Sequence, residues 1–301
     1  MSENALSQSR IATYEKCQRL YEFKYDWDVN VSGRMERYFE RGNVLHNSIE
    51  DVCEQVDADP ALTDEEIRDL ALDRVDYHWT DRMDRSEYYS DAEFEEDHLA
   101  TRARIEAFFD DGPGYDHARN SIETEKYVSF ERNGQEYHGY IDNIVRTDDG
   151  LNLVDYKTGS VKPPFSREYV RGHLDGDYRP DRVKPAVQAA LYLEAIKTSD
   201  LYTPGMDLEF VFYELRKSRG QEITREPGEI TVTIEGNARP VADGYRDQQD
   251  DVWELIEQCA DAITAETYSP EPFDEIYENT CESCEYRSIC PEYIDEGWSR
   301  V

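Results

Sequence analysis

The feature that most constrains this chain is a pair of apolar, β-branched runs within residues 137–157, separated by the polar turn 147–150, which contains Asp-Gly. Two such runs around a short turn predict a β-hairpin. In the register that this turn sets, Asp142 lies opposite Asp155, and Lys157, two residues further along, points to the same face. The hairpin therefore brings two carboxylates and one ammonium group together.

A second turn, Asn-Gly at positions 133–134, adds a third strand. Asn-Gly is the strongest short hairpin signal, and a two-residue loop there puts Glu125 opposite Asp142. Facing carboxylates destabilise a sheet, so the acidic cluster has two interpretations. Lys157 could simply offset the repulsion in an acidic chain, or the acidic groups could bind a divalent cation. We favour the metal site.

The length and pattern of the chain predict one domain, residues 1–301, of the α/β (α+β) class. Its centre is a mixed sheet over 122–234, in which a β-meander carries the acidic site and helices flank the sheet. Residues 57–120 are very acidic and helical by pattern, and we interpret them as a helical insertion before the sheet. Residues 267–301 form a tail that carries a cysteine cluster.

The chain is strongly acidic, with a formal net charge of -35. Such a charge opposes binding to nucleic acid, unless basic residues gather locally, as six do against four acidic residues between positions 162 and 184. The spread of acidic residues along the whole chain indicates a solvated surface suited to high salt, a halophilic trait. No targeting segment and no membrane-spanning window is visible, so we expect a cytoplasmic protein with no membrane partner.

Two predicted helices adjoin the acidic site. The first covers 34–56, and its apolar stripe leaves His46 at the edge. A histidine there is more often structural than a ligand, but this one can reach a site beneath the helix. The second helix covers 184–197 and is mostly apolar, so we expect it to pack on the sheet, with Gln188 and Tyr192 on one face.

Three cysteines near the end of the chain, Cys281, Cys284 and Cys290, have C-x2-C-x5-C spacing. In a chain without a visible signal peptide this spacing favours a metal or redox role over disulfides. Three thiolates leave one position open on a tetrahedral metal, and a distant fourth cysteine could complete an iron–sulfur cluster. The candidates for that fourth position are Cys17, Cys53 and Cys259.

Taken in order, these motifs resemble the PD-(D/E)XK nucleases, specifically the RecB-like branch with a cysteine cluster, which includes AddB nuclease domains and small CRISPR-associated exonucleases. The similarity spans almost the whole chain. The segments that carry it are 6–17, 41–46, 139–142, 155–157 and 188–192, followed by the three final cysteines.

The resemblance implies a metal-dependent deoxyribonuclease, an exonuclease by its nearest relatives, that hydrolyses phosphodiester bonds. Mg²⁺ or Mn²⁺ polarises the phosphate and lowers the pKa of a water molecule, and a histidine ligand favours Mn²⁺. Lys157 orients that water or stabilises the developing charge. The implied catalytic residues are Asp142, Asp155 and Lys157; the metal ligands are His46, Asp142, Asp155 and the Tyr156 carbonyl; Gln188 and Tyr192 contact substrate. From the Asn-Gly register we expect Glu125 just behind the ligands, and Glu50, one helical turn after His46, is a further candidate for such a position.

The same resemblance makes Cys17 the fourth ligand of an iron–sulfur cluster, of the 4Fe–4S type, with Cys281, Cys284 and Cys290. The implied partners are DNA that is single-stranded or has free ends, and a helicase or a CRISPR-adaptation protein, in DNA repair, recombination or CRISPR adaptation.

Two alternatives come from other classes of protein. One is a non-catalytic DNA-binding or scaffold subunit that keeps the nuclease fold and the cluster. The other is a zinc-stabilised acidic interaction protein, in which the carboxylates are only surface. Degenerate nuclease folds usually lose an acidic residue or the lysine, whereas this chain keeps them all, which favours the enzyme.

Overall fold

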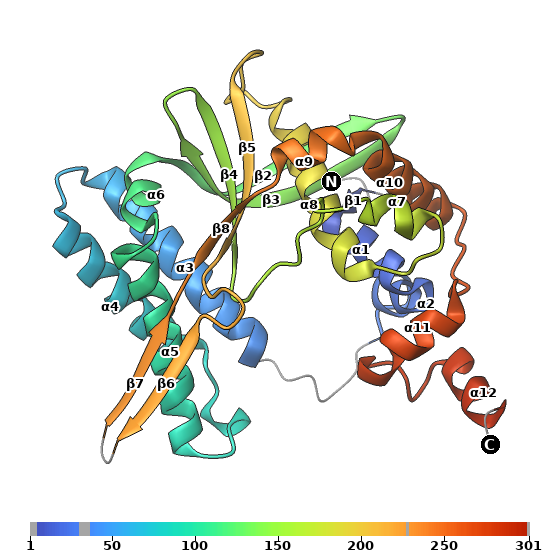
Figure 1. Ribbon diagram of the computed structural model, residues 1–301, viewed down its shortest axis with the longest axis horizontal. Coiled ribbons are helices and arrows are strands. Elements are labelled where there is room, and N and C mark those ends of the chain that lie inside the picture. Colours follow the sequence, from blue (N-terminus) through green and yellow to red (C-terminus); the bar gives the residue numbers. More distant parts are fainter. Residues whose placement is uncertain (1–4, 30–36, 227–228, 300–301) are drawn as a thin grey trace.

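A central mixed β-sheet flanked by helices forms the core of this protein (Figure 1), as the sequence predicts. The structure is a computed structural model that describes residues 5–29, 37–226 and 229–299. The first three positions of the predicted helix 34–56, and the ends of the predicted domain 1–301 and tail 267–301, lie outside the described residues.

The sheet has the order β1-β3-β4-β5-β8, with β2 also paired to β3, and a separate two-stranded ribbon joins β6 to β7. Strand β1 is parallel to β3 and β4 is parallel to β5, while the other pairs are antiparallel. The strands are β1 (Leu6–Ser7), β2 (Ser121–Arg132), β3 (Gln135–Arg146), β4 (Gly150–Lys157), β5 (Asp207–Glu214), β6 (Gln221–Glu226), β7 (Glu229–Ile234) and β8 (Asn237–Pro240).

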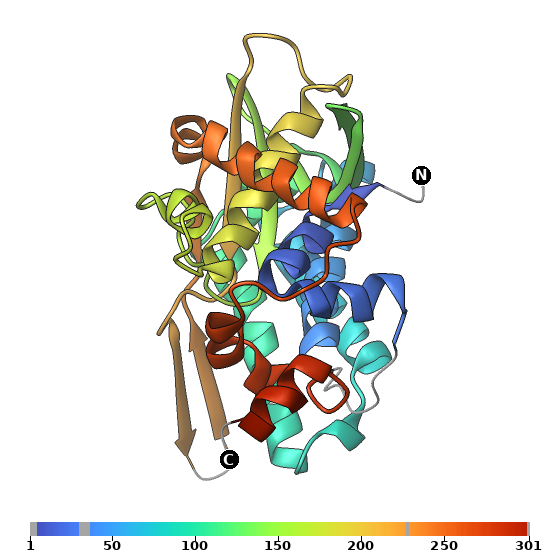
Figure 2. The ribbon, with the colours of Figure 1, turned by 90° about the vertical axis from the view of Figure 1, so that its right-hand side faces the viewer.

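Helices cover both faces of the sheet, and Figures 1 and 2 show that most of the acidic segment before the sheet is helical. The α-helices are α1 (Gln8–Lys16), α2 (Gln18–Tyr21), α3 (Arg37–Ala58), α4 (Asp64–Arg82), α5 (Asp91–Asp110), α6 (Gly114–Asn120), α7 (Tyr169–Leu174), α8 (Pro180–Ile196), α9 (Ala242–Asp247), α10 (Gln249–Thr264), α11 (Phe273–Asn279) and α12 (Pro291–Ser299). Short π- or 3-10 helices are η1 (Glu22–Asp26), η2 (Arg85–Glu87) and η3 (Cys281–Ser283).

Two hydrophobic cores lie on opposite faces of the sheet because successive strand residues point to opposite sides. On β4, Leu153 packs with helices α1, α8 and α10, whereas its neighbour Val154 packs with α3, α4 and α5. Both faces of this strand are therefore buried, which explains why its sequence is a nearly continuous apolar run. Among the described residues, no helix combines the length and the apolar character needed to cross a membrane.

Helix α8 begins earlier than the sequence predicts and packs very closely on the sheet. It starts at Pro180 rather than at residue 184, because proline is favoured in the first turn, where its missing N–H is not needed. Tyr192 of this helix lies against Gly139 of β3, and a Cβ atom at position 139 would overlap the tyrosine ring. Position 139 therefore needs glycine for lack of space.

We expect Gly139→Ala to lower the free energy of unfolding by about 1–3 kcal/mol, because the added methyl group must push α8 away from β3. Chemical denaturation of the purified variant measures this. A matched control is Gly172→Ala in α7, where the nearest atoms lie 3.9 Å from the added carbon. If the two variants have equal stability, the close approach of Tyr192 does not constrain position 139.

Candidate metal centre

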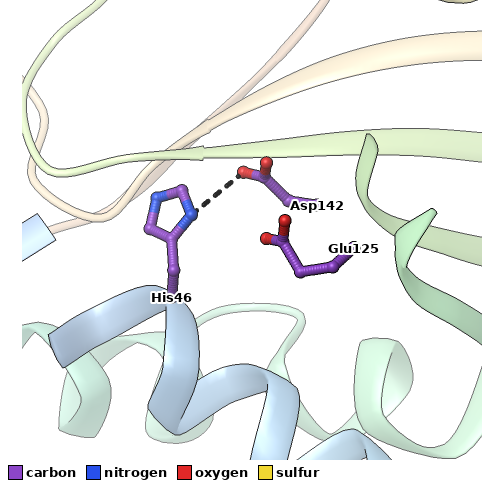
Figure 3. A group of neighbouring side chains, drawn as sticks. All are labelled: His46, Glu125 and Asp142. Carbon is purple, nitrogen blue, oxygen red and sulfur yellow. Dashed lines mark ion pairs between the residues drawn. The ribbon is translucent and has the colours of Figure 1, made fainter. Parts of the chain in front are cut away.

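Three side chains from separate elements meet between α3 and the strands β2 and β3. His46 comes from α3, Glu125 from β2 and Asp142 from β3, and Figure 3 shows them pointing toward one another. One potential ligand atom from each lies within 4.8 Å of the other two. Among the residues that the structure describes, this is the group of histidine, cysteine and acidic side chains that could hold a metal ion in this way.

The two predicted turns account for this meeting. Arg146 pairs with Leu151 in the β3–β4 hairpin, and Arg132 pairs with Gln135 in the β2–β3 hairpin, so both predicted registers are confirmed. The pairs on either side of Glu125, Thr124 with Asn143 and Lys126 with Ile141, put it level with Asp142.

The regular ladder ends at the site itself. The pairing of β3 with β4 runs only as far as Asn143 and Val154, so Asp142 does not face Asp155 as a ladder partner. Instead, Oδ2 of Asp142 accepts a hydrogen bond of 2.8 Å from the backbone N–H of Tyr156. Glu125, on the neighbouring strand, has a positive φ of 45°. The strands are thus locally irregular where the acidic groups gather.

The orientation of His46 is fixed by its two ring nitrogens. Nε2 lies 2.8 Å from the carbonyl oxygen of Tyr156, and Nδ1 lies 3.4 Å from Oδ2 of Asp142. A carbonyl oxygen only accepts, so Nε2 carries the proton and donates it. Burial lowers the pKa of His46 below its usual range, which favours the neutral ring. The lone pair of Nδ1 then faces a carboxylate, an arrangement that a cation between them stabilises.

The carboxylates have the electrostatics of a cation site. Burial is the main cause that raises the pKa of Asp142 well above its usual range, and the nearby charge of Asp155 raises it further. The pKa of Glu125 is raised by burial and by Asp142, and that of Glu50, on α3, by burial and by Glu125. Two carboxylates and an imidazole are donors that suit a divalent transition-metal ion, and the charge of the nearby Lys157 offsets only part of the shift of Asp142.

We expect Mn²⁺ to raise the melting temperature of the metal-free protein, and to do so more at pH 8 than at pH 5. A raised folded-state pKa means that the folded state binds more protons than the unfolded chain, so stability falls as pH rises above the usual carboxyl pKa of about 4. A bound cation removes that penalty. Thermal unfolding with and without Mn²⁺ measures the difference. His46→Ala should reduce the increase in melting temperature that Mn²⁺ causes. Glu131→Gln, a control on the same strand as Glu125, should not. An equal increase at pH 5 and pH 8 would contradict the assignment.

Asp155 and Lys157 form a second unit beside this group. Nζ of Lys157 lies 2.9 Å from Oδ1 and 2.5 Å from Oδ2 of Asp155, which is almost fully buried. Burial opposes the positive charge of Lys157, but Asp155 and Asp142 outweigh it and raise the pKa of the lysine. Lys157 is therefore an ammonium group at neutral pH. Nε2 of Gln188, from α8, also donates to Oδ1 of Asp155.

The other predicted site residues, Gln188, Tyr192 and Tyr156, are all buried. Gln188 and Tyr192 are both buried, so they hold Asp155 and β3 in place in this structure, and their contact with substrate stays a prediction. The carbonyl of Tyr156 accepts from His46, so its role as a metal ligand also stays a prediction.

One neighbour of the site was not predicted. Lys184, on α8, has its pKa lowered first by burial and then by the charge of Lys157, with smaller effects from Lys16 and Lys24. The basic excess of residues 162–184 is visible in the sequence and ends at Lys184. No sequence pattern, however, indicates that Lys16 and Lys24 act on Lys184.

The four predicted cluster cysteines lie together although they come from the two ends of the chain. Cys17 follows α1, and Cys281, Cys284 and Cys290 lie in and after η3. All four line one cavity with Arg19 and Arg287. In Figures 1 and 2 the C-terminal helices accordingly lie beside α2. Burial raises the pKa of the Cys17 thiol to about 11, and Cys281 and Cys284 contribute to that shift.

Comparison with known proteins gives one family. The model of the PD-(D/E)XK nuclease superfamily matches residues 5–291. No curated protein matches the chain. Among solved structures, a crystal structure of a "Putative exonuclease" from Eubacterium rectale is similar, with a TM-score of 0.45 and 13% sequence identity, over 94% of this chain and 86% of that one.

Proposed function

Because the chain belongs to the PD-(D/E)XK nuclease superfamily, we propose that it is a Mg²⁺- or Mn²⁺-dependent deoxyribonuclease, acting as an exonuclease of the RecB-like branch. The observation that carries the proposal is the group of His46, Glu125 and Asp142 directly beside the ion pair of Lys157 with the buried Asp155. A cation site next to a held ammonium group is what phosphodiester hydrolysis requires.

In this proposal each residue has a separate task. A divalent ion, held by His46 and Asp142 with Glu125 or Asp155, supplies Lewis-acid chemistry and lowers the pKa of water. Lys157, kept protonated by its carboxylate neighbours, stabilises the negative charge that develops on the phosphate. Asp155 and Gln188 hold the lysine side of the site, so the ammonium group is positioned before substrate arrives.

DNA needs positive charge in an otherwise acidic surface, and three lysines supply it near the site. The charges of Lys16 and Lys24 contribute to the lowered pKa of Lys184, and none of the three has an ion pair among the described residues. The other basic residues of the segment 162–184 are partly neutralised, for example Lys162 by its ion pair with Asp181. We infer that a DNA strand approaches Lys157 across these three lysines.

We also propose that the four clustered cysteines bind an iron–sulfur cluster of the 4Fe–4S type. The thiols of Cys17, Cys281, Cys284 and Cys290 line one cavity, and all four are free of disulfide bonds. Four cysteines that line one cavity fit a thiolate-bound group of this kind. The group ties the C-terminal segment to the first helices and so has a structural role.

For the cellular setting we propose DNA repair, recombination or CRISPR adaptation, with a helicase or a CRISPR-adaptation protein as partner, and a cytoplasmic location. A non-catalytic subunit is the second candidate. The complete set of Asp142, Asp155 and Lys157, held as described above, favours the enzyme over that candidate.

The test is a nuclease assay on end-labelled single-stranded and double-stranded DNA in high salt, with Mn²⁺, with Mg²⁺ or with chelator. We expect metal-dependent release of short products from the labelled ends. Circular single-stranded DNA distinguishes an exonuclease, which leaves it intact, from an endonuclease. A folded, metal-loaded protein that binds DNA but cuts none of these substrates would instead support the non-catalytic subunit.

A further inference from the structure

A second cavity, of about 220 Å³, lies between α3, α5 and the segment that joins β5 to β6, and four arginines line it. The elements that form it lie together in the lower left of Figure 1. None of these residues takes part in the metal centre described above. The arginines are Arg37, Arg41, Arg104 and Arg216.

The central observation is that Arg104 is buried and has no ion pair with an acidic residue in the part of the chain that the structure describes. Its side chain is 3% exposed, and its Nη1 donates only to the carbonyl oxygen of Ala100, one turn earlier in α5, at 2.9 Å. Its Nε–H has no hydrogen-bond partner among the described residues. A buried charge that lacks a partner is costly, so such residues usually face a ligand or a counter-charge.

The charge of Asp97 acts on Arg104, but no acidic residue that lines the cavity forms an ion pair with it in the described part of the chain. Asp97 uses one carboxylate oxygen for Arg41, at 2.8 Å, and the other for the hydroxyl of Tyr88, at 2.9 Å. Glu93 is taken by Arg37, at 3.0 Å, and by a backbone N–H. Glu96 pairs outward with Arg225, at 2.6 Å. Each carboxylate that lines the cavity thus bonds to a residue other than Arg104, two of them to Arg37 and Arg41 of the same cavity.

Two further arginines add unmet donors to the same cavity. The Nε–H of Arg41 is buried and has no partner among the described residues. Arg216 donates to the amide oxygen of Gln221 at 2.6 Å and has no carboxylate partner in the described part of the chain. Arg41 and Arg216 also lower the pKa of Arg104, which lies at about 10 chiefly because of burial, so its guanidinium still carries a charge at neutral pH.

We propose that this cavity is a phosphate-binding site, in which Arg104, Arg41 and Arg216 bind a phosphate group of the nucleic-acid strand that the nuclease cuts. Guanidinium groups are the preferred partners of phosphate oxygens, since they offer several N–H donors in one plane. The identity of the ligand as nucleic acid rests on the function proposed above, whereas the affinity for phosphate rests on the cavity alone.

The position of the cavity allows one nucleic-acid strand to contact both the metal centre and the cavity. Glu214, the last residue of β5, pairs with Lys157 of β4, and Arg216 follows it two residues later in the chain. Arg41 lies on α3, the helix that also carries His46. A strand whose scissile phosphate contacts Lys157 can therefore place a neighbouring or terminal phosphate in the cavity.

The first experiment uses inorganic phosphate and the full chain, and it does not depend on cleavage. We expect calorimetric titration to show binding to the unaltered protein and at least about tenfold weaker binding to Arg104→Met. Arg102→Met is the matched control, because Arg102 lies on the same helix but pairs with Asp76. In phosphate-free buffer Arg104→Met should melt at or above the temperature of the unaltered protein, since it removes an unpaired buried charge. A purely structural Arg104 predicts a lower melting temperature and unchanged phosphate binding, and that result would overturn the site.

The second experiment identifies the source of the phosphate, with oligonucleotides that carry a 5′-phosphate or a 5′-hydroxyl group, in chelator so that no cutting occurs. If the site holds a terminal phosphate, the unaltered protein prefers the phosphorylated end and Arg104→Met loses that preference. If it holds a backbone phosphodiester, Arg104→Met weakens both oligonucleotides equally. Unchanged affinity of the variant for both would refute the proposed role in DNA binding. Phosphate binding at Arg104 without any DNA cleavage would uphold the cavity and contradict the nuclease.

Discussion

Replacing Lys157 with Met is expected to reduce DNA cleavage by at least about a hundredfold while leaving the fold intact. The lysine is the ammonium group nearest to the acidic site, and removing a preorganised group that stabilises transition-state charge has effects of this size. Its partner Asp155 stays bonded to Gln188, so the variant keeps one of the interactions that hold the carboxylate. Initial rates on end-labelled single-stranded DNA, with Mn²⁺, measure the loss.

The matched control is Lys197→Met. Lys197 lies just beyond α8 and forms one ion pair with Glu194, at 2.8 Å, as Lys157 does with Asp155. The Lys197→Met variant should cleave DNA at the rate of the unaltered protein. Asp155→Asn should resemble Lys157→Met, because it leaves the lysine without its main carboxylate. If Lys157→Met and Asp155→Asn both cleave at unaltered rates, these residues do not form the catalytic site.

The sequence predicted those features of the site that depend on local chemistry. An Asn-Gly turn and a four-residue turn that contains Asp-Gly each specify their hairpin register almost alone. Those registers put Glu125 level with Asp142, and the structure has both side chains at the same place. The extent of α8 was predicted less well, because its first turn, at Pro180, carries few apolar residues.

The features that the sequence could not predict depend on where regular structure stops. Period-two alternation puts Ile141 and Asn143 on one face, yet Ile141 packs toward α8 while Asn143 bonds to Cys53 of α3. The alternation breaks at Asp142, where β3 separates from β4. A register argument extrapolates the ladder beyond that point, so it pairs Asp142 with Asp155 when the carboxylate in fact bonds to the backbone of Tyr156.

The arginine cavity illustrates a second limit. Arg104 lies on α5 in a sequence that is acidic and helical by pattern, and nothing local distinguishes it from Arg102, which is half-exposed and paired. Its burial arises from the packing of α3 and of the segment after β5 against that helix. Because those contacts join positions far apart in the sequence, such as Arg41, Arg104 and Arg216, only a three-dimensional structure reveals them.

Replacing Cys17 with Ala is expected to remove the iron and the broad visible absorbance, and to lower the melting temperature strongly. Cys17 and Cys281 come from opposite ends of the chain, so a group bound to both closes a very long loop. By analogy with disulfides, such a link contributes roughly 5 kcal/mol, comparable to the whole stability of many domains. The cluster lies apart from the metal centre, so nuclease activity should fall only as far as the protein unfolds. Iron analysis, absorbance and thermal unfolding of the same preparation test this.

Two other cysteines provide matched controls for this replacement. Cys53 is buried and accepts a hydrogen bond from Asn143, and Cys259 is buried and donates to Glu15, so neither thiol lines the cavity of the cluster. Cys53→Ala and Cys259→Ala should therefore keep the full iron content, even if each loses some packing. Iron retained by Cys17→Ala, or one zinc ion and no iron in the unaltered protein, would rule out the four-cysteine iron–sulfur assignment. The zinc result would still leave the two ends of the chain joined by a metal, and the stability loss of Cys17→Ala would then measure that link instead.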